Sequence, residues 1–315
     1  MQIYHRIILS FFFILLVFLV INPCFLLADE DYRIVIIQSR ILTPYNNALR
    51  GFTDKVSNET LKTTYTEYNL EDYVGKEQEI TENIINIKPS IIFAIGTEAA
   101  LFSKTNLKEN PIIFSMVLDP IGTKIVESFD GPNENITGVY LKISIEDQFR
   151  KLKEVIPNLK KVGMLYDANS STKSKEEAED AAKKLDLILV AQGVYSKADI
   201  DKTLDDILNE VDCLWAGVDT FIYNPQSAQH IILKTLRNKI PFMAFSSNYV
   251  NAGALMTLEC DYADIGAQAA EIAIKVMKGA KPESISVQAP RKMKLIINQK
   301  TAQTIGIKMP RASLE

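Results

Sequence analysis

Short apolar runs alternate with longer amphipathic segments from Arg33 onward. Five early runs are brief and rich in β-branched or aromatic residues, as buried strands are; they are 33–38, 64–68, 90–96, 111–117 and 135–141. Apolar positions at helical spacing fill three of the gaps, at 43–57, 72–88 and 97–104. This alternation predicts a parallel sheet covered by helices on both faces.

The same pattern restarts after Leu141. It predicts helices at 144–155, 173–185, 197–209 and 225–238, and strands at 161–167, 187–193, 211–217 and 240–246. The end of the chain adds strands 253–259 and 292–298 and helices 261–278 and 299–305. No long Gly/Ser linker separates the halves, so we predict an α/β protein with two doubly wound parallel-sheet lobes joined by short crossovers.

Residues 1–28 have the pattern of a signal peptide. Arg6 precedes an apolar run, and Ala28 stands directly before three acidic residues. This order predicts export, with cleavage after Ala28 and a periplasmic or other extracytoplasmic location. Two alternatives stay open: an uncleaved leader could anchor the chain in the membrane, and Cys24 could carry a lipid, although Pro23 precedes it where a small residue is usual.

The composition of the chain limits the classes of partner that it is expected to bind. The net charge of −4 does not favour nucleic acid or an anionic membrane. Beyond the leader only Cys213 and Cys260 remain, each in an apolar segment, so they are either buried thiols or one disulfide.

The residues that enzymes use are scarce. Beyond the leader the chain has one histidine, His230, within the amphipathic helix 225–238. No Cys/His pair has metal-ligand spacing, and the Gly96 turn matches no glycine-rich phosphate loop. We therefore expect no enzyme, no metal and no cofactor.

Polar residues follow the predicted strands, where parallel sheets bind ligands through loops and helix N-termini. The candidate ligand-binding residues are Ser39, Thr97, Asp119, Tyr166, Asn169, Ser170, Asp219, Thr220 and Ser246.

Several motifs resemble one family. Gly96-Thr97, Pro111–Phe114 with Asp119-Pro120, and Asn135–Gly138 are similar to its GTxxA, PIVF, DP and GNxTG motifs. Residues 162–170, 251–282 and 295–310 continue the likeness. The sequence resembles the ABC-transporter substrate-binding protein family that includes tryptophan- and tyrosine-type solute receptors.

The resemblance implies a type I periplasmic-binding-protein fold with a three-crossover hinge. The expected division is a signal peptide at 1–28, a first lobe of 29–142 plus 261–282, and a second lobe of 143–260 plus 283–315. It also implies a small solute held between the lobes, first of all an aromatic or other α-amino acid, and a membrane ABC permease as partner. We expect a monomer.

From their positions, Thr97 can offer its hydroxyl and backbone N–H at a helix N-terminus to a carboxylate, and Asp219 either accepts hydrogen bonds from an ammonium group or has a structural role. Asp119 either touches the solute or braces the first crossover, and Tyr166, Asn169 and Ser170 either touch it or cap a helix. Arg40 departs from the family pattern and either faces an anionic group or is solvated.

A different class of function fits the same fold. A sensory module tethered by its leader would report solute occupancy to a membrane signalling partner. A transcription regulator needs a DNA-binding segment where the apolar leader stands, which disfavours that class of function.

Overall fold

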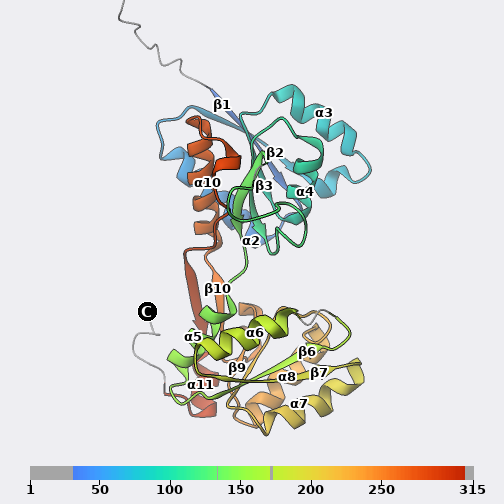
Figure 1. The fold of residues 1–315 in the computed structure, drawn as a ribbon, viewed down its shortest axis with the longest axis vertical. Coiled ribbons are helices and arrows are strands. Elements are labelled where there is room, and N and C mark those ends of the chain that lie inside the picture. The colour runs from blue at the N-terminus through green and yellow to red at the C-terminus, as the bar shows by residue number, and fades with distance from the viewer. Residues whose placement is uncertain (1–30, 133, 171–172, 309–315) are drawn as a thin grey trace, which may run out of the picture.

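The computed structural model describes residues 31–132, 134–170 and 173–308. Within these residues the chain forms two α/β lobes, one above the other in Figure 1. The predicted signal peptide lies outside the described residues. Among the described helices, none has the length and apolar character that a membrane span requires.

The first sheet has the order β2-β1-β3-β4-β5, with every pairing parallel. Its strands are β1 (Tyr32–Gln38), β2 (Thr63–Asn69), β3 (Ile91–Ile95), β4 (Ile112–Val117) and β5 (Ile136–Tyr140). The central strands are buried on both faces, which explains why β3 is continuously apolar and β4 is apolar except for the buried Ser115.

Helices cover both faces of this sheet. On one face α2 (Thr43–Ser57) and α10 (Tyr262–Met277) pack on the strands, with the Phe52 ring stacked on Phe93 at 3.9 Å. The other face is covered by α3 (Glu77–Ile87) and α4 (Thr97–Asn106). The predicted helix 72–88 is shorter because a 3₁₀ turn, η1 (Leu70–Tyr73), precedes it and Gly75 adopts a positive φ of 76°.

The second sheet has the order β11-β10-β9-β8-β6-β7. Its strands are β6 (Lys161–Asp167), β7 (Ile188–Val194), β8 (Cys213–Trp215), β9 (Phe242–Met243), β10 (Met256–Cys260) and β11 (Met293–Ile297). All pairings are parallel except that of β11, which runs antiparallel to β10 at the sheet edge. The predicted α/β fold with two parallel-sheet lobes is confirmed, with this one antiparallel addition.

Helices again lie on both faces of the second sheet. One face carries α5 (Ile145–Val155), α6 (Lys173–Lys184) and α11 (Gln299–Ile305). The other carries α7 (Ile200–Leu208), preceded by the 3₁₀ turn η2 (Lys197–Asp199), and α8 (Pro225–Arg237). Next to α8 lies α9 (Ser247–Ala252), which the sequence pattern did not predict.

The chain passes between the lobes three times. It crosses after β5 at 141–144, returns after β10 at Asp261 so that α10 joins the first lobe, and crosses again after a 3₁₀ turn, η3 (Pro282–Ser284), on the way to β11. The third crossing comes later than the expected boundary at 282, because Gln288 bridges to Val139 and the Ile285 carbonyl accepts a hydrogen bond from Thr137. Residues 285–288 therefore pack with the first sheet.

Candidate functional site

The carboxyl ends of the parallel strands in both sheets face the crossovers. β5 ends directly before the first crossover, and β10 ends directly before the second. Strands of a parallel sheet share one direction, so the loops that follow them in the two lobes face each other across the crossovers. This is the edge at which the sequence placed its candidate residues.

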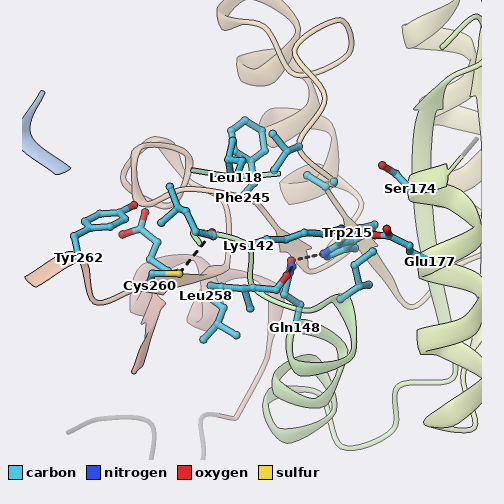
Figure 2. A pocket seen from close by; sticks show the side chains of 17 residues that line it. Leu118, Lys142, Gln148, Ser174, Glu177, Trp215, Phe245, Leu258, Cys260 and Tyr262 are labelled. Atoms are coloured by element: carbon cyan, nitrogen blue, oxygen red, sulfur yellow. Dashed lines mark hydrogen bonds and ion pairs between the residues drawn. The ribbon is translucent and has the colours of Figure 1, made fainter. Parts of the chain in front are cut away.

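A cavity of about 300 Å³ lies at the crossovers and is lined by both lobes. Leu118, which follows β4, lines it from the first lobe, and Trp215 and Phe245 line it from the second (Figure 2). The first crossover supplies Lys142, and Tyr262 stands where the second crossover enters α10. The lining is largely apolar and aromatic, with a few charged groups, as is typical of sites for small organic molecules.

Trp215 is held in a fixed orientation at this cavity. Its indole Nε1 donates a hydrogen bond to Oε1 of Gln148 on α5 at 2.8 Å. Its ring meets Phe149 edge to face, with centroids 5.2 Å apart. The indole is therefore preorganised as an apolar wall.

An ion pair crosses the floor of the cavity. Nζ of Lys142, on the first crossover, lies 2.5 Å from Oε2 of Glu177 on α6. Among the described residues that line the cavity, Lys142 is the single cation. The carboxylate of Glu259 is already engaged, because it accepts a hydrogen bond from the backbone N–H of Ser247.

A second cavity, of about 520 Å³, adjoins the first. Leu118, Lys142, Ile145 and Glu177 line both, so the Lys142–Glu177 pair stands where the two meet. Asp119 lines the second cavity from the first lobe.

The candidate residues of the first lobe differ in their engagement. Oγ of Ser39 accepts a hydrogen bond from the backbone N–H of Ala99 at 2.9 Å and so closes the first turn of α4. Oδ1 of Asp119 accepts one from Gly122 N–H at 2.9 Å, within its own turn. The hydroxyl of Thr97, the first residue of α4, makes no hydrogen bond with the residues that the structure describes.

In the second lobe, Asp219 braces the loops around it. Its Oδ2 accepts a hydrogen bond from Asp167 N–H at 3.1 Å, and its Oδ1 accepts from the N–H groups of Phe221 and Ile222 at 2.9 and 3.1 Å. Three backbone donors thus already satisfy this carboxylate in the structure. The arrangement joins the loop after β8 to the end of β6.

The other candidates of this lobe fall into two groups. Asn169 donates from Nδ2 to the Tyr195 carbonyl at 2.9 Å, and the Ser170 hydroxyl donates to the Asp167 carbonyl at 3.2 Å. The hydroxyls of Tyr166, Thr220 and Ser246 have no hydrogen-bond partner in the described part of the chain. Thr97 shares this property with these three residues.

Neighbouring polar groups have local partners. Arg40 forms an ion pair with Glu98 at 2.8 Å on the exposed edge of the first lobe. Hydrogen bonds from its own backbone N–H and from Ser39, together with the nearby Arg40 charge, hold the pKa of Glu98 below its usual value.

Burial raises the pKa of Tyr262 to about 12, so the phenol beside the cavity stays neutral. Cys213 and Cys260 are both free and buried.

Sequence reasoning missed the residues that line the 300 Å³ cavity. None of the nine candidates is among them, whereas Lys142, Gln148, Trp215, Phe245 and Tyr262 are. Two of these had a usable signal, because Trp215 and Phe245 stand near the carboxyl ends of the predicted strands 211–217 and 240–246.

A match to a family model shows to which protein family the chain belongs. The model described as ABC transporter substrate binding protein matches residues 45–314. The chain belongs to this family. The Tyrosine-binding protein of Clostridioides difficile (strain R20291) is 28% identical over 243 residues, which cover 76% of this chain and 69% of the relative.

Solved structures of substrate-binding proteins share the fold. One is the ligand-free, open structure of a substrate-binding protein with adhesive properties from Clostridium difficile, with a TM-score of 0.80 and 22% identity, covering 89% of this chain and 96% of that one. Another is an ABC domain in complex with L-Trp from Streptococcus pneumonia, with a TM-score of 0.63 and 25% identity, covering 90% and 98%. The predicted family and fold are thereby confirmed.

Proposed function

We propose that the protein is an extracytoplasmic receptor that binds an amino acid, first of all an aromatic one, between its two lobes and delivers it to an ABC permease. The cavity that joins both lobes to the first crossover is the observation that carries this proposal. Trp215, Phe245 and Tyr262 offer aromatic surface to a ring, and the Lys142–Glu177 pair offers both signs of charge. The names of the relatives, one tyrosine-binding and one in complex with L-Trp, support the solute class.

Free hydroxyls on the facing loops supply further contacts. We propose that Thr97 from the first lobe and Tyr166, Thr220 and Ser246 from the second bind the solute directly when the lobes approach. The remaining candidates, Ser39, Asp119, Asn169, Ser170 and Asp219, hold the loops in shape through the hydrogen bonds described above. Binding in this form needs hinge closure and no covalent chemistry.

Isothermal titration calorimetry tests the solute class. We expect saturable binding of the purified protein to L-tyrosine or L-tryptophan, and no heat with glycine or D-glucose as controls. A ligand at about 100 times its Kd stabilises the native state by about 2.7 kcal/mol, so a matching rise in melting temperature is expected. Binding of sugars in preference to aromatic amino acids would overturn the proposal.

Uptake measurements separate transport from sensing. With a transport receptor, deleting the chain from its host abolishes high-affinity uptake of the solute that calorimetry identifies. With a sensory module, uptake is unchanged while solute-dependent gene expression is lost. A retained, uncleaved leader would accompany the second result.

A further inference from the structure

We propose that the Lys142–Glu177 ion pair recognises the charged head group of the solute, with Lys142 binding the α-carboxylate and Glu177 the α-ammonium group. This inference rests on the proposed function and deepens it, because it selects zwitterionic α-amino acids over uncharged rings and sugars.

The distribution of charge in the cavity carries the first step. A carboxylate that enters this cavity requires a cation, and Lys142 is the one that the described lining provides. An ammonium group has three N–H donors, and Nζ of Lys142 makes a single described interaction, with Glu177. Two donors therefore remain for a carboxylate.

The other polar groups nearby are already committed. Gln148 accepts the indole hydrogen bond of Trp215, and Glu259 accepts the backbone N–H of Ser247. Asp219 is satisfied by backbone donors. Glu177 is the carboxylate at the cavity whose described partner is a flexible side chain, so it can turn toward an ammonium group.

The position of Lys142 supports the same role. It belongs to the first crossover, between the two lobes, so its amine lies beside both. The stem of Lys142 extends across the cavity floor toward Trp215 and Glu177 in Figure 2. A head group bound there leaves the side chain of the solute against Trp215, Phe245 and Leu118.

Replacing the Lys142–Glu177 ion pair by contacts with a solute costs little free energy. The Lys142 and Glu177 side chains are 49% and 35% exposed, and ion pairs this exposed add little to stability. A bound zwitterion replaces this one ion pair by two charge-assisted contacts, one between its carboxylate and Lys142 and one between its ammonium group and Glu177. The alternative is that the pair only fastens the crossover to α6.

Three related ligands and three variants separate these roles. Calorimetry compares L-tyrosine with L-tyrosinamide, which lacks the carboxylate, and with 3-(4-hydroxyphenyl)propionate, which lacks the ammonium group. The variants are Lys142→Met, Glu177→Gln and the control Lys184→Met. Lys184 lies on the same helix as Glu177 and pairs with Glu146 at 3.3 Å, but it lines only the second cavity.

We expect Lys142→Met to weaken L-tyrosine and the propionate about ten- to hundredfold and to leave tyrosinamide unchanged, since it removes a charged hydrogen-bond donor. Glu177→Gln should weaken L-tyrosine and tyrosinamide and spare the propionate. The Lys184→Met variant should bind all three ligands as the wild type does. An equal change for all three ligands in Lys142→Met would assign the pair to the hinge and overturn this inference alone. A wild-type protein that binds no aromatic amino acid would overturn the proposed function and this inference with it.

Discussion

The close contact between α2 and α10 holds α10, the helix that follows the second crossover, in the first lobe, and a substitution in this contact tests it. These helices approach so closely that a Cβ built on Gly266 would overlap the carbonyl oxygen of Ala48. The same Cβ would lie 2.7 Å from the Ala48 carbonyl carbon and 2.9 Å from the backbone nitrogen of Phe52. Both neighbours are helical backbone, so neither can turn aside. We expect Gly266→Ala to separate the two helices.

The magnitude follows from this geometry. The Cβ would lie 1.8 Å from the Ala48 carbonyl oxygen, so the helices must move apart by about 2 Å to restore the 3.5–4.0 Å separation that non-bonded atoms prefer. Overpacking typically costs about 1–3 kcal/mol, and a shift of whole helices lies at or above the upper end of that range. Alanine regains about 1 kcal/mol of helix propensity over glycine, which offsets only part of the loss. We therefore expect a net loss of about 2–3 kcal/mol, or roughly 4–12 °C in melting temperature for a lobe of this size.

Thermal unfolding followed by circular dichroism measures the effect. Lys275→Ala, an exposed change on the same helix, is the control and should unfold within about 0.5 kcal/mol of the wild type. Gly51→Ala should behave like Gly266→Ala, because its Cβ would overlap the carbonyl oxygen of Ala263 in the reverse direction. A Gly266→Ala protein as stable as the wild type would refute the close contact of these helices.

Three further predictions use single residues as reporters. Trp215 is the one tryptophan of the chain and lines the cavity, so L-tyrosine should change its fluorescence saturably; an unchanged spectrum at full occupancy would argue against this cavity. Burial raises the pKa of Cys260 to about 12, and that of Cys213 is raised as well, so at pH 8 iodoacetamide should label both only in denaturant, as peptide mass spectrometry can show. Hydrogen bonds from Arg291 hold the pKa of Glu271 below its usual value of 4.5, so its contribution to stability is present above that pH and lost as the pH falls through the lower value. The stability difference between wild type and Glu271→Gln should therefore shrink from pH 6 to pH 3 in urea titrations, and a constant difference would contradict the ion pair.

Much of the fold was predictable because it depends on local pattern. A buried parallel strand such as β3 is an uninterrupted apolar run, and helices such as α7 show their buried face at regular spacing. The helix α9 escaped prediction because it has six residues and buries only Val250. The direction of β11 escaped because strand direction follows from where the chain re-enters the lobe, which no local pattern encodes.

The site was predictable only in part for the same physical reason. Strand-end loops are visible in a sequence, so Thr97, Tyr166, Thr220 and Ser246 were found on the edges that face the crossovers. The place of Lys142 depends on how three separate crossovers meet, and its partner Glu177 follows it by 35 residues. A lysine in a short connecting segment is ordinarily solvated, so only the tertiary structure distinguishes this one.

The exposed apolar residues of the strand-end loops bear on how a solute would close the lobes. Ile41 and Leu118 follow strands of the first sheet and are 63% and 50% exposed, and Val218 follows β8 of the second sheet and is 70% exposed. These side chains lie at the edges that face the crossovers, so an approach of the lobes removes them from water whether or not a solute is present. Leu118 and Val218 also line the cavity, whereas Ile41 does not, so this apolar surface stabilises the closed form partly through contact with the solute and partly without it. A solute shifts the equilibrium only through the contacts that it makes better in the closed form than in the open one, so specificity must come from the cavity residues and affinity from both groups.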